Sequence, residues 1–140
     1  SSIFTFSIHA EKNFPFRKFP SDLDIGLDSG TGDADYLAVL EEALWRVLAQ
    51  AGADLVIYLA GADPYVGDKL GHLALSKAGL LARDRLVLES CRRKGLPVAI
   101  AMAGGYAPNL DDIADIHFNT LRLAAELARN DPARPVKLRD

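Results

Sequence analysis

The fold is decided by one stretch of the sequence, Leu55-Val56-Ile57-Tyr58-Leu59-Ala60-Gly61-Ala62-Asp63-Pro64-Tyr65-Val66-Gly67-Asp68. Its first six residues are apolar and include two β-branched members, which predicts a strand buried on both faces, as in parallel sheets. Gly61, Pro64 and Gly67 then end regular structure, so Asp63 lies just beyond the carboxyl end of the strand. Ligands of open α/β sheets bind at that edge. Asp63 is therefore a candidate ligand-binding residue, and the alternative is an aspartate that caps a turn or the next helix.

A second apolar run ends in the same way. Residues 96–103, LPVAIAMA, predict another buried strand, and Gly104-Gly105-Tyr106 follows directly. About thirty residues with one helical pattern separate the two runs, which is the spacing of a βαβ unit with parallel strands. In that arrangement Asp63 and Tyr106 lie on the same rim of the sheet. The alternative for Tyr106 is a tyrosine that packs at a strand end.

The other patterns complete an alternation of strands and helices. Strands are predicted over residues 2–9 and, after an irregular segment, 23–27. Helices are predicted from Asp33, as N-cap, to Gly52, from Ser76 to Gly95, and from about Asn109 to Arg129. The order predicts an α/β fold with a small parallel sheet flanked by helices. We interpret residues 1–140 as a single domain, with 131–140 as a tail.

Length and composition are those of a soluble globular domain. The chain has 140 residues, of which 49% are hydrophobic and 25% charged. A net charge of −3 gives no reason to expect binding to nucleic acid or to an anionic membrane. No apolar run approaches the twenty or so residues that a membrane span needs. The single cysteine, Cys91, falls in a helical pattern and is expected to be a buried thiol in a reducing compartment, so we expect a cytoplasmic protein.

Four segments together resemble the zinc-dependent histone deacetylase family, which has the three-layer αβα arginase/deacetylase fold. They are AGADPYVGDKLG at residues 60–71, AMAGGYAP at 101–108, IFTFSIHAEKNFPFR at 3–17 and SDLDIGLDSGTGDADYL at 21–37. The last two are similar to the bacterial, class IV-like branch. The family's tandem catalytic histidines and its Asp-x-His pair of zinc ligands precede the matched region. The resemblance therefore implies that this chain is the carboxyl-terminal part of a deacetylase.

The resemblance implies chemical roles for Asp63 and Tyr106. Asp63 would be a carboxylate ligand of Zn²⁺, one of the three protein ligands that a catalytic zinc takes. Tyr106 would be the catalytic residue that donates a hydrogen bond to the amide oxygen as it becomes an oxyanion. A neutral phenol suits that role because it is a donor at neutral pH.

Five further residues have implied binding roles. Gly104, Gly105 and Leu70 would contact the substrate, with Leu70 lining the acyl-lysine tunnel, and core packing is the alternative for Leu70. Ser7 and Ile8 would supply a hydroxyl and a main-chain carbonyl to a structural monovalent cation, K⁺ or Na⁺.

The implied activity is zinc-dependent hydrolysis of the amide of an acetylated amine, such as acetyl-lysine or an acetylpolyamine. The chain alone is expected to be inactive because the catalytic histidines and two zinc ligands are missing from it. An alternative is a non-catalytic α/β module that self-associates, since loss of the upstream strands would expose a sheet edge. A nucleotide-binding α/β domain is a third hypothesis, but no GxGxxG or GxxxxGK[ST] phosphate loop is present.

Overall fold

The computed structural model describes residues 3–130, which form four strands and three helices. The element order is the one that the sequence predicts, although the first strand begins at Phe6 rather than near residue 2. The predicted tail, residues 131–140, lies outside the described residues. The elements are β1 (Phe6–Ala10), β2 (Leu23–Leu27), α1 (Asp33–Gln50), β3 (Val56–Gly61), α2 (Lys77–Arg93), β4 (Val98–Ala103) and α3 (Leu110–Arg129).

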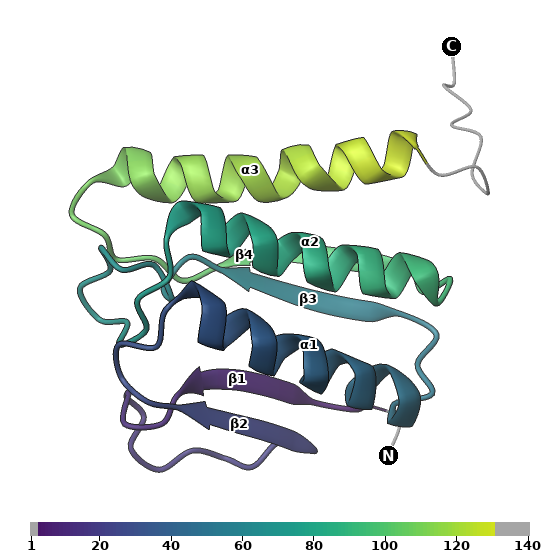
Figure 1. The fold of residues 1–140 in the computed structure, drawn as a ribbon, viewed down its shortest axis with the longest axis horizontal. Coiled ribbons are helices and arrows are strands. Elements are labelled where there is room, and N and C mark those ends of the chain that lie inside the picture. The colour runs from purple at the N-terminus through teal and green to yellow at the C-terminus, as the bar shows by residue number, and fades with distance from the viewer. Residues whose placement is uncertain (1–2, 131–140) are drawn as a thin grey trace.

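The strands are parallel, and their arrows all point the same way in Figure 1. This confirms an α/β fold with parallel strands and flanking helices. The strands do not form one continuous sheet, because β1 pairs with β2, and β3 pairs with β4, in two separate two-stranded sheets. Each pair is joined by a crossover segment, and the β3–β4 crossover contains α2.

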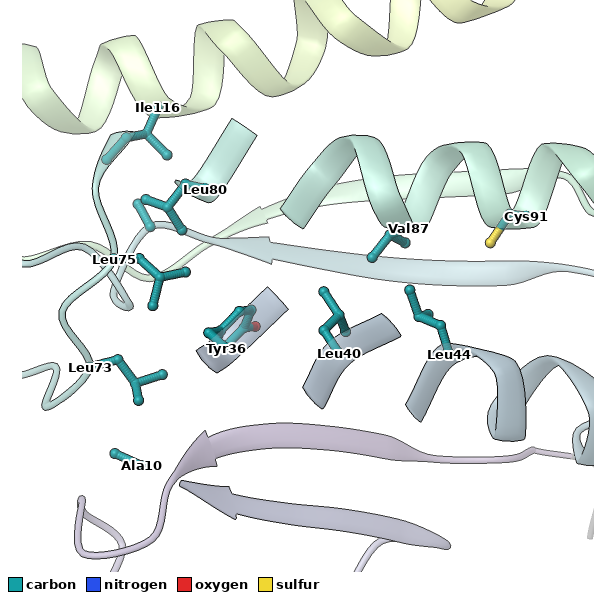
Figure 2. Close-up of a cluster of buried hydrophobic side chains, with 11 residues drawn as sticks. Ala10, Tyr36, Leu40, Leu44, Leu73, Leu75, Leu80, Val87, Cys91 and Ile116 are labelled. Carbon is teal, nitrogen blue, oxygen red and sulfur yellow. The ribbon is translucent and has the colours of Figure 1, made fainter. Parts of the chain in front are cut away.

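The core connects both strand pairs through the helices. Figure 2 shows Tyr36, Leu40 and Leu44 on α1 in one buried cluster with Val87 and Cys91 on α2. The same cluster takes in residues of β1 and, at its margin, of β2, β3 and β4. Helix α1 therefore packs against both strand pairs. Cys91 is fully buried, as its helical position predicts.

The first two helices start at a shared hydrogen-bonded junction. Ser76 is the N-cap of α2, as predicted, and its hydroxyl accepts a hydrogen bond from the Gly79 N–H at 2.9 Å. The prediction that Asp33 is the N-cap of α1 is wrong, because Gly32 occupies that position and Asp33 is the first helical residue. The Asp33 carboxylate instead accepts from the Ser76 N–H at 2.8 Å and the Ser76 hydroxyl at 2.6 Å. A distant pair of donors thus replaces the local N–H groups that a cap would bind.

Helix α3 covers α2 on its outer side (Figure 1). It begins as predicted, because the Asn109 side chain accepts from the Asp111 N–H at 3.1 Å. Ile116, Thr120 and Leu123 are its buried residues. In the part of the chain that the structure describes, no helix combines the length and apolar character needed to cross a membrane.

Candidate functional site

The carboxyl ends of β3 and β4 form one rim. Gly61 lies opposite Ala103 in the parallel register, and the Ala62 N–H donates to the Ala103 carbonyl at 2.9 Å. Asp63 follows the end of β3 by two residues and Tyr106 follows the end of β4 by three. The loops that carry these residues are at the same end of the strands in Figure 1. The structure thus brings Asp63 and Tyr106 to one end of the sheet, where the sequence pattern places them.

The Asp63 carboxylate lies against two glycines, one from each strand end. A Cβ atom added to Gly61 would lie 2.4 Å from Asp63 Oδ1, and one added to Gly104 would lie 2.3 Å from it. Both distances are far below contact, so this carboxylate position requires glycine at both sites. Gly104 also has φ +60°, a left-handed conformation that glycine adopts without strain. The glycines therefore create the space in which Asp63 sits.

The electrostatics of Asp63 favour a positively charged partner. Partial burial raises the pKa of its carboxyl above the ordinary value. The nearby Asp68 raises the pKa further, whereas a backbone hydrogen bond and the charge of Arg83 lower it. A carboxylate that is partly desolvated beside a second acid gains stability when a cation binds to it.

Asp68 connects the two turns of the rim, and its role is not evident from the sequence patterns described above. Its Oδ1 accepts from the Leu70 N–H at 2.8 Å and from the Gly71 N–H at 2.7 Å. Its Oδ2 accepts from the Tyr106 N–H at 2.5 Å, and the Tyr106 carbonyl accepts from the Lys69 N–H at 3.4 Å. Asp68 therefore caps a turn, the role that was the alternative for Asp63. A local signal for this role exists, since an aspartate directly after Gly67 is typical of a side chain that binds turn N–H groups.

Tyr106 and Leu70 are both exposed side chains of this rim. Tyr106 is 61% exposed and Leu70 is 57% exposed, so neither packs in the core. Gly105 has φ +116°, and a Cβ there would approach Ala62 and Ile113 at 3.2 Å. Gly105 therefore allows the chain to pass close to the β3 turn and to α3 before it presents the Tyr106 phenol.

Ser7 and Ile8 belong to the other strand pair. Ile8 lies opposite Ile25 in the β1–β2 register. The Ser7 hydroxyl lies 2.9 Å from His9 Nδ1. Their predicted role as ligands of a monovalent cation stays a prediction.

Asp63 and Asp68 are two carboxylates of the rim, and both oxygens of Asp68 accept hydrogen bonds from backbone N–H groups. Across residues 3–130, no three His, Cys, Asp or Glu side chains are grouped to hold a metal ion. The Asp63 carboxylate has suitable chemistry for zinc, but a catalytic zinc takes three protein ligands. A zinc centre here would need two more ligands from outside these residues. A separate groove of about 330 Å³ between α1 and α2, lined in part by Trp45 and Leu86, contains no residue of the rim.

Comparison with known proteins identifies the family. The Histone deacetylase domain family matches residues 1–121. The chain belongs to the histone deacetylase family. An uncharacterized protein from Picosynechococcus sp. is 47% identical to this chain over 126 residues, which are 90% of the chain and 42% of that protein. Histone deacetylase 2 of Arabidopsis thaliana is 34% identical over 108 residues, covering 74% of the chain and 28% of the plant protein.

Solved structures agree with the predicted arginase/deacetylase fold. A crystal structure of an HDAC homolog complexed with SAHA superposes with a TM-score of 0.71 at 25% identity, covering 87% of this chain and 35% of the other. An HDAC homolog from Aquifex aeolicus gives a TM-score of 0.70 at 24% identity over the same shares. The chain spans less than half the length of these relatives.

Proposed function

We propose that this chain is the carboxyl-terminal part of a cytoplasmic, zinc-dependent deacetylase of the bacterial, class IV-like branch. Its substrate is an acetylated amine, such as acetyl-lysine or an acetylpolyamine. The observation that carries the proposal is the shared rim, where Asp63 lies against Gly104 two residues before Tyr106. The 42% coverage of the Picosynechococcus protein supports a larger enzyme that contributes the remaining zinc ligands and the catalytic histidines.

Asp63 would hold Zn²⁺ together with ligands from outside these residues. The bound ion would polarise the substrate carbonyl and lower the pKa of water. Glycine at positions 61 and 104 leaves room for the Asp63 carboxylate at the rim, so the observed carboxylate position is open to a ligand without a change in either strand end.

Tyr106 would stabilise the oxyanion that forms from the amide oxygen. Its phenol is a neutral donor at pH 7, and its hydrogen bond strengthens only as negative charge develops. Asp68 and Lys69 hold the Tyr106 N–H and carbonyl, while the side chain stays exposed. The backbone is thus anchored and the phenol is free to meet a substrate. The exposed Leu70 would contact the acyl-lysine chain beside Gly104 and Gly105.

The test compares zinc content and deacetylation of acetyl-lysine peptides and acetylpolyamines in the longer polypeptide that contains this chain. We expect Asp63→Ala to lose zinc and activity together. Tyr106→Phe removes one oxyanion donor, so we expect it to keep zinc and to lower kcat about 10²- to 10³-fold. Asp54→Ala is the matched control, since Asp54 is an exposed aspartate that precedes the opposite end of β3.

Retention of zinc and activity by Asp63→Ala would contradict the proposed role of Asp63. Residues 1–140 alone, with zinc added, are expected to show no turnover. Robust turnover by the isolated chain would contradict its proposed incompleteness.

A second candidate function, self-association of the isolated chain, is favoured by the uncovered strands. Ile57 and Leu59 alternate along β3 and are 69% and 66% exposed, although parallel sheets are normally covered on both faces. We propose that a second copy covers this face or adds to a free strand edge. Light scattering should show mass that rises with concentration, and Leu59→Lys should reduce it more than Trp45→Lys, which changes an exposed residue of α1. A monomer at every concentration would contradict this.

A further inference from the structure

Helix α2 contains a buried ion pair that the sequence patterns do not predict. Arg83 is 4% exposed and the adjacent Asp84 is 1% exposed. Arg83 Nε donates to Asp84 Oδ1 at 2.9 Å, and Arg83 Nη2 lies 2.8 Å from the same oxygen. Burial of two charges is costly unless both are well bonded. The pair therefore requires further partners that hold it in place.

The Asp84 carboxylate is anchored by two other elements. The Tyr58 hydroxyl, from β3, donates to Asp84 Oδ1 at 2.6 Å. The Thr120 hydroxyl, from α3, donates to Asp84 Oδ2 at 2.5 Å. The pair thus connects β3, α2 and α3. The Asp84 carboxylate, which is held by these bonds, in turn holds the Arg83 guanidinium in position.

The other end of Arg83 reaches the strand that leads to Asp63. Arg83 Nη1 donates to the Gly61 carbonyl at 2.6 Å. The N–H groups of Val56 and Ala62 bond toward β4, and in a parallel strand alternate residues direct their backbone groups to opposite sides. The Gly61 carbonyl therefore faces away from β4, which cannot bond to it. Arg83 supplies the missing donor at the last residue of β3.

We propose that Arg83 is a positioning residue that fixes the turn from Gly61 to Asp63. The role of Asp63 in this inference rests on the proposed function. The guanidinium holds the Gly61 carbonyl through Nη1 while Nε stays bonded to Asp84, so the turn is tied to the core two residues before Asp63. A lysine ammonium keeps the charge but lacks the planar fork that makes both bonds in fixed directions.

The first experiment measures the turn in the chain itself. We compare the ¹³C shift of the Gly61 carbonyl and the amide shifts of Ala62, Asp63 and Gly104 in wild type, Arg83→Lys and Thr120→Val. Thr120→Val is the matched control because it removes a bond to Asp84 without touching Gly61. We expect Arg83→Lys to shift these signals and Thr120→Val to leave them in place. Unchanged signals in Arg83→Lys, or equal shifts in both variants, would overturn the inference.

A double variant keeps the test valid if Arg83→Lys does not fold. Arg83→Met combined with Asp84→Leu removes both charges at similar volume, so no uncompensated charge stays in the core. This double variant should show the same shifts at Gly61, Ala62 and Asp63. Wild-type shifts in it would overturn the inference.

The second experiment measures zinc affinity, by chelator competition, in the longer polypeptide that contains this chain. Removing the hydrogen bonds that position a metal ligand lowers metal affinity about 10- to 100-fold. We expect a decrease in zinc affinity of that size for Arg83→Lys and no decrease for Thr120→Val. If Asp63→Ala abolishes zinc binding but Arg83→Lys leaves it unchanged, the inference is overturned. If Arg83→Lys moves the Gly61 and Asp63 signals while Asp63→Ala leaves zinc binding intact, the positioning of the turn is supported and the proposed function fails.

Discussion

The substitution Gly104→Ala tests the contact that fixes Asp63. The new Cβ would lie 2.3 Å from Asp63 Oδ1 and 3.0 Å from Asp63 Cγ, and the backbone there has φ +60°. Gly95 offers a matched control, because it has φ +69° and no atom lies within 4 Å of an added Cβ. Gly95→Ala therefore carries the backbone cost without the clash.

Gly104→Ala should lower the free energy of unfolding through two effects, the left-handed backbone at position 104 and the displacement of the Asp63 side chain. An L-residue in the left-handed conformation costs about 1–2 kcal/mol, which applies to Gly95→Ala and Gly104→Ala alike. Displacing Asp63 from its rotamer costs about 0.5–1.5 kcal/mol more. We expect Gly104→Ala to lower the free energy of unfolding by about 1.5–3.5 kcal/mol in total. In an Asp63→Ala background the extra cost should largely disappear, since the two shortest contacts, to Asp63 Oδ1 and Cγ, are removed.

Urea unfolding followed by circular dichroism gives the free energy of unfolding for the wild type, Gly95→Ala, Gly104→Ala, Asp63→Ala and the double variant Asp63→Ala/Gly104→Ala. The decisive quantity is the coupling energy between the substitutions at Asp63 and Gly104. Equal losses for Gly95→Ala and Gly104→Ala, or a coupling energy of zero, would refute the packing of Asp63 against Gly104.

Three further predictions concern groups around the rim and in the core. Asp68→Asn weakens the bonds to the rim N–H groups, so it should lower stability by about 1–3 kcal/mol and speed hydrogen exchange at the Tyr106 amide; unchanged exchange would contradict the anchoring role of Asp68. Burial raises the pKa of Tyr36 to about 12, so the unfolded chain ionises first and stability should fall as pH rises from about 10 to 12. Urea midpoints against pH should fall less steeply for Tyr36→Phe, and identical slopes would contradict the burial argument. Burial also raises the pKa of the Cys91 thiol, so iodoacetamide at pH 8 should alkylate the folded chain at least about tenfold more slowly than the chain in urea; equal rates would show that Cys91 is accessible.

Local patterns were enough to predict the parts of the fold that carry the candidate site. Apolar runs ended by glycine and proline predicted β3 and β4, and their spacing predicted the parallel arrangement that places Asp63 and Tyr106 at one end. Ser76 and Asn109 were predictable as helix starts because a capping side chain binds N–H groups only two or three residues away.

The features that the sequence did not reveal depend on contacts between distant residues. The Asp33 carboxylate binds Ser76, which is 43 residues away in the sequence, instead of the first N–H groups of its own helix. A local pattern cannot reveal that partner. Arg83 and Asp84 would ordinarily be solvated helix residues, and hydrogen bonds with Tyr58, Gly61 and Thr120 offset part of the cost of burying them.

The separation of the strands into two pairs was also not predictable from local pattern. An apolar or alternating run predicts a strand, but the run does not say which other strand lies beside it. Pairing is decided by the tertiary arrangement, in which α1 packs against both pairs.

We propose that Asp63 and Tyr106 face one zinc site. Anomalous diffraction at the zinc edge, from zinc-loaded crystals of the longer polypeptide that contains this chain, would locate the ion relative to both side chains. We expect zinc about 2.0–2.2 Å from an Asp63 carboxylate oxygen, with the Tyr106 hydroxyl directed into the same cavity. Zinc bound without Asp63, or a Tyr106 phenol directed away from the ion, would contradict it.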